Sequence, residues 1–250
     1  MKVYGVPRLI LKDAPHLFTH CPGCHHPLIE KLMAEVIEEL GIEGRVICVA
    51  GVGCNHRFPI RIDTDGINTA HGRAPDVATA IKRVLGREAV VYTIEGDGDC
   101  IAIGASSLIN AAMRGERITV IMANNANYGT TGGQLAPTTL IGQRTSTTPE
   151  GRDPKRDGYP IKTAELLSHI KGVCYSARGS VHTPQNYKRT KEYVKKALKK
   201  QMDDIGFTFV EIISACPTDW HLSPIESLKF IEEKMLSEFP LGEFIDLEEI

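Results

Sequence analysis

Residues 89–134, AVVYTIEGDGDCIAIGASSLINAAMRGERITVIMANNANYGTTGGQ, decide the fold. An apolar run, Ala89–Glu95, leads into Gly-Asp-Gly-Asp at 96–99, and a helical pattern follows over Ile101–Arg114. A second apolar run, Ile118–Ala123, then ends in two asparagines. Continuously apolar runs are typical of strands buried on both faces of a parallel sheet. The stretch therefore predicts a strand–helix–strand unit whose two strands end at the same edge of the sheet.

The same alternation extends in both directions along the chain. Strand plus helix in repetition predicts an α/β fold, with a mostly parallel sheet and helices on both faces. We expect one domain over residues 1–250. The stretch Gly129–Pro160 shows no helical or strand periodicity of apolar residues, and a loop of this length is usually functional or mobile. Further strands are expected at Arg45–Val52, Gly172–Ser176 and Phe207–Ile213, and further helices at His26–Leu40, Ala74–Leu85, Pro184–Asp203 and Pro224–Glu238.

Composition excludes several classes of protein. The 250 residues are 42% hydrophobic and 24% charged with a net charge of −2, which argues against a disordered chain. The basic segment Lys188–Lys200 has an apolar face, so its lysines are interpreted as a solvated face and no nucleic acid is expected. No apolar run approaches a membrane span, and residues 1–18 lack the apolar core of a signal peptide. A cytoplasmic protein outside the membrane is expected, with its seven cysteines as free thiols or ligands.

A metal–diphosphate site is predicted where the two central strands end. Asp97 follows the first strand and Asn125 the second, so their side chains should be neighbours. Carboxylate and amide oxygens suit Mg²⁺, which completes its coordination with phosphate and water. Gly96 and Gly98 leave backbone N–H groups accessible, and a following helix N-terminus favours an anion. Neither a G-x-G-x-x-G fingerprint nor a Walker A motif is present.

Four cysteines lie beside Gly or Pro at expected loops or strand ends: Cys21, Cys24, Cys54 and Cys216. Four thiolates could hold Zn²⁺ or an iron–sulfur cluster, and the residues alone do not decide between them. A zinc ribbon would need a second C-x-x-C, and a thioredoxin-like pair would not use the two later cysteines. His25 and His26 are interpreted as helix-start residues rather than zinc ligands. Cys48 and Cys174, inside apolar runs, are interpreted as buried thiols, and Cys100 as a small helix-start residue.

The Gly96-Asp97-Gly98 segment followed by Asn124-Asn125 resembles the thiamine diphosphate motif. The next residues, Asn127 to Gln134 (NYGTTGGQ), resemble the β subunit of the 2-oxoacid:ferredoxin oxidoreductases, and the likeness covers roughly residues 15–220. The resemblance implies that Mg²⁺ is bound by the Asp97 and Asn125 side chains and the Asn127 carbonyl. It implies cofactor contacts at Val52, Gly53, Cys54, Asn55, His71, Gly72, Arg73, Ala74, Gly98, Asp99, Gly129 and Thr130.

The resemblance also supplies a choice of metal and a reaction. It implies that Cys21, Cys24, Cys54 and Cys216 hold a [4Fe–4S] cluster near the thiamine. The implied activity is oxidative decarboxylation of a 2-oxoacid to acyl-CoA and CO2, with electrons passing to ferredoxin. An α-type partner subunit would carry the Glu that activates thiamine, and γ and ferredoxin-like δ subunits would complete a heteromer. Two alternatives stay open: a non-oxidative thiamine-dependent decarboxylase subunit, and a zinc-stapled scaffold subunit.

Overall fold

The computed structural model describes residues 7–10 and 20–249, so most of the stretch examined for a targeting segment lies outside the described residues. The strands are β1 (Val46–Ala50), β2 (Asp65–Asn68), β3 (Val90–Gly96), β4 (Thr119–Asn124), β5 (Val173–Ser180), β6 (Phe207–Ile213) and β7 (Gly242–Asp246). The α-helices are α1 (His26–Leu40), α2 (Ala74–Leu85), α3 (Ala105–Met113), α4 (Pro154–Asp157), α5 (Thr163–Ser168), α6 (Pro184–Met202), α7 (Pro217–Trp220), α8 (Pro224–Phe230) and α9 (Leu236–Glu238). The other helical segments are of two kinds. Cys54–Ile60 and Gly86–Glu88 are 3₁₀ helices, and Asp99–Ile103 and Ile231–Met235 are π helices.

The strands form one sheet in the order β2-β1-β3-β4-β6-β5-β7. Every pairing is parallel except that of β7 with β5. The predicted α/β fold is thereby confirmed. In the central pair, Gly96 of β3 lies opposite Ala123 of β4, so the two strands end level with each other. This register places the polar residues after both strands at one edge, as the sequence predicts.

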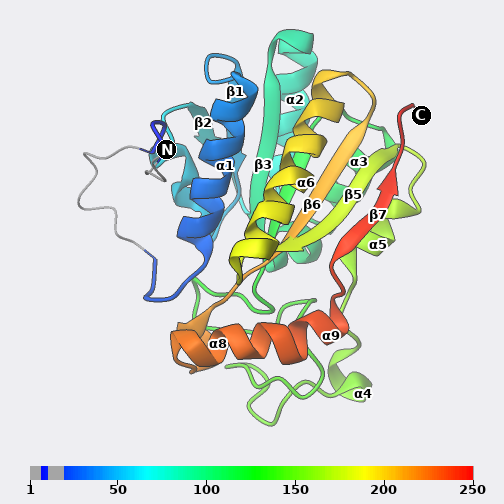
Figure 1. Cartoon of the computed structure of the whole chain (residues 1–250). Helices are drawn as coiled ribbons and strands as arrows, with labels where there is room; N and C mark the ends of the chain where they lie inside the picture. The colour runs from blue at the N-terminus through cyan, green and yellow to red at the C-terminus, as the bar shows by residue number, and fades with distance from the viewer. Residues whose placement is uncertain (1–6, 11–19, 250) are drawn as a thin grey trace.

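Helices cover both faces of the sheet, α1 and α6 on one face and α2, α3 and α5 on the other (Figure 1). Each face has its own apolar core. The first packs α1 and α6 residues such as Leu32 and Leu198 against the sheet, and the second packs residues such as Ala78 and Leu108. β3, β4, β5 and β6 are buried almost throughout, which explains the mostly apolar sequences of β3, β4 and β6.

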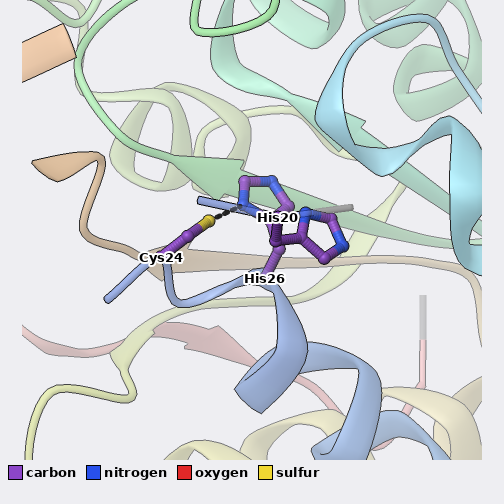
Figure 2. A group of neighbouring side chains, drawn as sticks. All are labelled: His20, Cys24 and His26. Atoms are coloured by element: carbon purple, nitrogen blue, oxygen red, sulfur yellow. Dashed lines mark hydrogen bonds between the residues drawn. The ribbon is translucent and has the colours of Figure 1, made fainter. Parts of the chain in front are cut away.

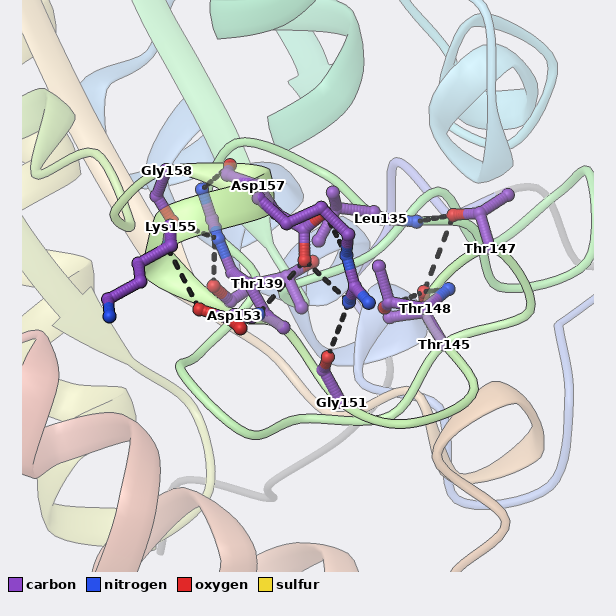
Figure 3. Close-up of polar contacts among 12 residues, drawn as sticks. Leu135, Thr139, Thr145, Thr147, Thr148, Gly151, Asp153, Lys155, Asp157 and Gly158 are labelled. Carbon is purple, nitrogen blue, oxygen red and sulfur yellow. Dashed lines mark hydrogen bonds and ion pairs between the residues drawn. The ribbon is translucent and has the colours of Figure 1, made fainter.

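A further layer lies beneath the carboxyl ends of the strands, where α8 and α9 run beside the loops around α4 (Figure 1). A small apolar cluster that includes Leu140, Met235 and Phe239 holds this layer together. Polar contacts order the aperiodic stretch Gly129–Pro160, such as those of Thr147 with Leu135 and of Thr145 with Thr148 (Figure 3). Arg152, which is 5% exposed, makes the largest number of these contacts. Its guanidinium donates to the carbonyls of Ala136, Pro137, Thr139, Asp157, Gly158 and Tyr159.

The structure departs from the sequence-based expectations at several elements. β2 and β7 were not predicted, and β5 continues four residues beyond Ser176. The helix expected from Ile101 begins two residues earlier, as a π turn, and continues as α3 after Gly104. The lysines of α6 are not simply a solvated face, because Lys191, Lys195, Lys196 and Lys200 all form ion pairs with carboxylates. Within the described residues, no helix combines the length and apolarity that a membrane crossing requires.

Candidate functional site

The site lies at the carboxyl edge of the sheet, where the loops after β1, β3, β4 and β6 meet. The turn 51–55 follows β1, Asp97 and Gly98 follow β3, and Asn125–Thr131 follows β4. Cys216 follows β6 and immediately precedes α7. Two adjoining cavities open among these loops.

The first, termed the cofactor cavity, has a volume of about 110 Å³. It brings together most of the residues expected to contact thiamine diphosphate and Mg²⁺. Three of its buried side-chain oxygens have no hydrogen-bond partner within the described residues: Asn55 Oδ1, Asp99 Oδ2 and Asn127 Oδ1. Such oxygens suit a bound cation or a cofactor with donor groups. The expected residues that line this cavity are Val52, Gly53, Cys54, Asn55, His71, Asp97, Gly98, Asp99, Asn125, Asn127, Gly129 and Thr130.

Asp97 lies almost wholly buried at the edge of this cavity, with 1% of its surface exposed. Its Oδ1 accepts from the Gly98 N–H at 2.9 Å, and its Oδ2 accepts from the Thr138 hydroxyl. Burial raises the pKa of Asp97 to about 7, against the opposing effect of these hydrogen bonds. A divalent cation would favour the ionised carboxylate, so the residue fits a magnesium ligand.

Asp99 and His71 form a polar pair on the neighbouring wall. Asp99 Oδ1 accepts from the Gly72 N–H at 2.6 Å and also contacts His71 Nδ1. Burial raises the pKa of Asp99, and the contacts with Gly72 and His71 oppose that shift. The His71 ring meets the Tyr128 ring edge-on at 6.2 Å, and the Tyr128 hydroxyl donates to the Gly98 carbonyl. The ring of His71 is therefore fixed beside the cavity.

The second, termed the cluster cavity, has a volume of about 240 Å³. All four cysteines expected to bind a metal line it: Cys21, Cys24, Cys54 and Cys216. The other three cysteines, Cys48, Cys100 and Cys174, are buried and do not line it. The separation of the two groups agrees with the distinction drawn from their sequence contexts.

The thiols of the cluster cavity are held by polar neighbours. Cys54 Sγ lies 3.1 Å from the Thr130 hydroxyl, and Cys216 Sγ lies 3.2 Å from Asp219 Oδ2. Burial raises the pKa of Cys24 to about 12 and also raises the pKa values of Cys54 and Cys216. Thiols in this environment stay protonated at neutral pH unless a metal replaces the proton, which suits ligands rather than free nucleophiles.

Two histidines accompany Cys24 in the cluster cavity. One ligand atom each of His20, Cys24 and His26 lies within 4.8 Å of the others (Figure 2). His25 is the residue before α1 and His26 is its first residue, so both are helix-start residues as expected. Burial lowers the pKa of His26 to about 3, which keeps its ring neutral.

The two cavities share a wall. Five residues line both of them: His26, Cys54, Asn125, Gly129 and Thr130. A methyl group added at Gly129 would come within 3.4 Å of Asn125 Nδ2 and within 3.6 Å of Cys216 Sγ. A predicted magnesium ligand and a predicted cluster ligand thus lie on either side of one glycine. Groups bound in the two cavities would be separated by no more than this wall.

Three residues expected to contact the cofactor line neither cavity, and some residues of the site were not predicted. Gly72 contacts Asp99 through its N–H but does not line either cavity. Arg73 donates to the Ser107 hydroxyl at 2.8 Å, and Ala74 is buried in the core at the start of α2. Sequence reasoning missed Thr138, because nothing in its aperiodic loop distinguishes it. It also gave His26 and Tyr128 no part in the cofactor site, although both line the cofactor cavity.

Comparison with known proteins identifies related chains. Residues 45–212 match the family "Thiamine pyrophosphate enzyme, C-terminal TPP binding domain". The chain is 41% identical to ketoisovalerate oxidoreductase subunit VorA of Methanothermobacter thermautotrophicus over 94% of its own length and 49% of that relative's. It is 34% identical to 2-oxoglutarate synthase subunit KorB of Methanocaldococcus jannaschii, covering 94% of this chain and 88% of the relative. The chain thus spans about half the length of the VorA relatives.

A solved structure has the same architecture. The 2-oxoglutarate:ferredoxin oxidoreductase from Magnetococcus marinus, with 2-oxoglutarate, coenzyme A and succinyl-CoA bound, superposes with a TM-score of 0.79. The sequences are 25% identical, and the match covers 99% of this chain and 87% of that one.

Proposed function

The chain belongs to the thiamine pyrophosphate enzymes and, among them, to the family of 2-oxoacid:ferredoxin oxidoreductase subunits, and from this premise we propose that it is the catalytic subunit of such an enzyme. The proposed reaction converts a 2-oxoacid and CoA to acyl-CoA and CO2. In this reaction the substrate loses two electrons, and a [4Fe–4S] cluster held by the four cysteines would relay them singly to two molecules of ferredoxin. Thiamine diphosphate would supply the nucleophilic carbon, and the cluster would accept the electrons one at a time.

The observation that carries the proposal is the shared wall between the two cavities. Cys54 and Thr130 line both, and their side chains lie 3.1 Å apart. A non-oxidative decarboxylase would gain nothing from four cysteines gathered beside its cofactor. An oxidoreductase needs this proximity, because electrons must pass from the reacting carbon to the cluster.

In the cofactor cavity, we assign the magnesium ion to Asp97, Asn125 and Asn127. The Asp97 carboxylate is oriented by the Gly98 N–H and the Thr138 hydroxyl, and Asn125 Oδ1 accepts from the Asn127 N–H at 3.4 Å. The diphosphate would lie against the backbone of Gly53 and Gly129, where the absence of side chains allows close approach. A methyl group on Gly53 would meet only the Thr130 hydroxyl, at 4.0 Å, so its backbone is open to the cavity.

In the cluster cavity, we assign the four thiols as the ligands of the [4Fe–4S] cluster. Cys216 is 8% exposed, and Cys24 and Cys54 are partly buried, whereas Cys21 is exposed at the mouth of the cavity. All seven cysteines of the chain are free thiols, as in the reducing cytoplasm where we place the protein. An α-type partner would supply the Glu that activates thiamine, so the working unit is proposed to be a heteromer.

The test is a comparison of variants of the anaerobically purified complex. Asp97→Ala should abolish binding of thiamine diphosphate while leaving the iron content unchanged. Asp65→Ala, at an exposed position of β2, is the matched control and should retain both. Cys54→Ser should lose iron, whereas Cys174→Ser, in the core, should keep it. A panel of 2-oxoacids with CoA and a low-potential dye then measures the activity of the wild-type complex.

The outcomes separate the proposed function from its alternatives. Broad absorbance near ~400 nm, with about four iron atoms per chain and dye reduction dependent on a 2-oxoacid, would support the oxidoreductase. Bound thiamine with CO2 release and no iron would identify a non-oxidative decarboxylase. Zinc without thiamine would identify a scaffold subunit, with His20, Cys24 and His26 as the natural ligand group.

A further inference from the structure

His26 lies in the wall between the two cavities, and the function proposed above does not use it. Its ring is 2% exposed and lines both the cluster cavity and the cofactor cavity. The residue begins α1, so its backbone is fixed by the helix. A buried, polar ring between a predicted cluster ligand and a predicted cofactor pocket needs a physical explanation.

The ring is aimed at one cluster ligand. His26 Nδ1 lies 3.2 Å from Cys24 Sγ, within hydrogen-bonding distance for sulfur (Figure 2). A thiolate bound to iron has no proton to give, so in the loaded protein Nδ1 must carry the hydrogen and donate it. The geometry therefore requires the tautomer of the neutral ring that is protonated at Nδ1.

A second histidine fixes the plane of the ring. His20 stacks on His26 with ring centroids 5.3 Å apart and planes 13° apart. His20 Nε2 lies 3.0 Å from Oε1 of Glu30, whose side chain is 1% exposed. Glu30 stands one helical turn after His26 on α1. Glu30, His20 and His26 thus form a buried support that aims Nδ1 at the sulfur.

We propose that His26 is a positioning residue for the cluster, which donates its Nδ1 hydrogen to Cys24 Sγ and thereby raises the reduction potential of the cluster beside the cofactor. This inference rests on the proposed function, since it needs the cluster. Reduction adds negative charge that is shared with the ligand sulfurs, and a hydrogen bond to a sulfur stabilises the reduced state more than the oxidised state. Such hydrogen bonds are among the features by which proteins set cluster potentials.

The test is a redox titration of the cluster in the purified complex, followed by electron paramagnetic resonance of the reduced state. His26→Leu removes the donor and should lower the one-electron reduction constant about tenfold, which corresponds to about 59 mV. His26→Asn places an amide donor near the Nδ1 position and should keep most of the wild-type potential. His26→Gln places its donor nearer the Nε2 position and should behave like His26→Leu.

His25→Leu is the matched control, because His25 is also a buried histidine at the start of α1 but lines neither cavity. Its cluster should titrate as in the wild type. A wild-type potential in His26→Leu with full iron content would overturn the inference. If the Leu variant does not retain iron, the Asn and Gln variants decide, and equal potentials in those two would overturn it.

The same measurement distinguishes a failure of the proposed function. A wild-type complex without any cluster signal would overturn the proposed function, and this inference with it. A wild-type cluster whose potential does not respond to the position of the donor at residue 26 would overturn this inference alone.

Discussion

Substitution of Gly51 by alanine tests whether the turn after β1 is built around Asp99. A methyl group at Gly51 would lie 1.6 Å from Asp99 Oδ2 and 2.8 Å from its Cγ. The collision is steric only, because Gly51 has no left-handed backbone angle. Asp99 is 2% exposed, so its carboxylate has little free space into which it can turn.

The magnitude follows from the contacts that Asp99 must give up. Rotation of the carboxylate breaks its hydrogen bond from the Gly72 N–H, at 2.6 Å, and its contact with His71 Nδ1. Hydrogen bonds to a charged group contribute about 1.5–3 kcal/mol each, so loss of both costs about 3–6 kcal/mol. If local shifts preserve one contact, a loss of about 1.5–3 kcal/mol remains, which lowers Tm by about 3–12 °C in a domain of this size.

The assay is thermal and urea unfolding of Gly51→Ala against Gly44→Ala. Gly44 is the matched control, because a methyl group there meets nothing within 4 Å. Gly51→Ala should also weaken thiamine diphosphate binding about tenfold, since one displaced contact of His71 is worth about 1.4 kcal/mol. A stability equal to that of Gly44→Ala would refute the reasoning.

A double-mutant cycle isolates the cause. In an Asp99→Ala background the collision partner is gone, so Gly51→Ala should cost less than about 1 kcal/mol. If Gly51→Ala is as costly in that background as in the wild type, the collision with Asp99 is not the origin of the loss.

Three further predictions concern other parts of the molecule. Arg152→Met should cost about 2–4 kcal/mol and expose residues 129–160 to limited proteolysis, because the lost guanidinium leaves several buried carbonyls unpaired. Arg156→Met is the control and should cost less than about 1 kcal/mol, because its side chain is 54% exposed and pairs with a single carboxylate. Burial raises the pKa of Cys48 to about 12, so about one thiol in 10⁴ is ionised at pH 8. In peptide mass spectra of the metal-free chain, iodoacetamide should therefore label the exposed Cys21 and leave Cys48 unmodified. Early labelling of Cys48 would contradict this. Arg178→Met should lower the free energy of unfolding, measured in urea, by about 3–5 kcal/mol, because Glu211 would remain buried without its cation. The double variant with Glu211→Leu should recover part of that loss. If it recovers none, the ion pair is not the cause.

The strands β3, β4 and β6 could be predicted from sequence because burial on both faces makes them mostly apolar. The expected run Phe207–Ile213 coincides with β6, and Ala89–Glu95 differs from β3 by one residue at each end. β2 had no such signal, because all four of its residues, Asp65–Asn68, are exposed at the edge of the sheet. β7 is likewise an edge strand of mixed polarity.

The strand predicted at Gly172–Ser176 ends earlier than β5 for a different reason. Its second half contains Arg178, which reads as a surface residue in any hydropathy pattern. In the structure the side chain is fully buried between Glu165 and Glu211. A charged residue can occupy a buried strand only when its partners are in place, and those partners lie on α5 and β6. Pairing between distant segments is not visible in a local pattern.

The candidate site divides along the same line. Residues at or just beyond a strand end, such as Asp97, Asn125 and Cys216, could be placed because the topology of a parallel sheet brings strand ends together. Thr138 could not, because its contact with Asp97 depends on the path of a loop that is organised by Arg152 from its far end. Arg73 and Ala74 show the converse, since a sequence motif extended beyond the residues that line the cavity.

The shared wall is the feature that neither motif could specify. One motif places oxygen ligands after β3 and β4. The other places two thiols before α1 and one thiol each after β1 and β6, so each motif describes its own group. β1 pairs with β3 and β6 pairs with β4, so the thiol-bearing loops flank the oxygen-bearing loops on both sides. The cluster cavity therefore lies across the carboxyl ends of the two central strands, and some residues must line both cavities. His26, Gly129 and Thr130 are among the residues in these positions. A change at any of the three should alter thiamine binding and cluster properties together, whereas a change at Asp97 should alter the first alone.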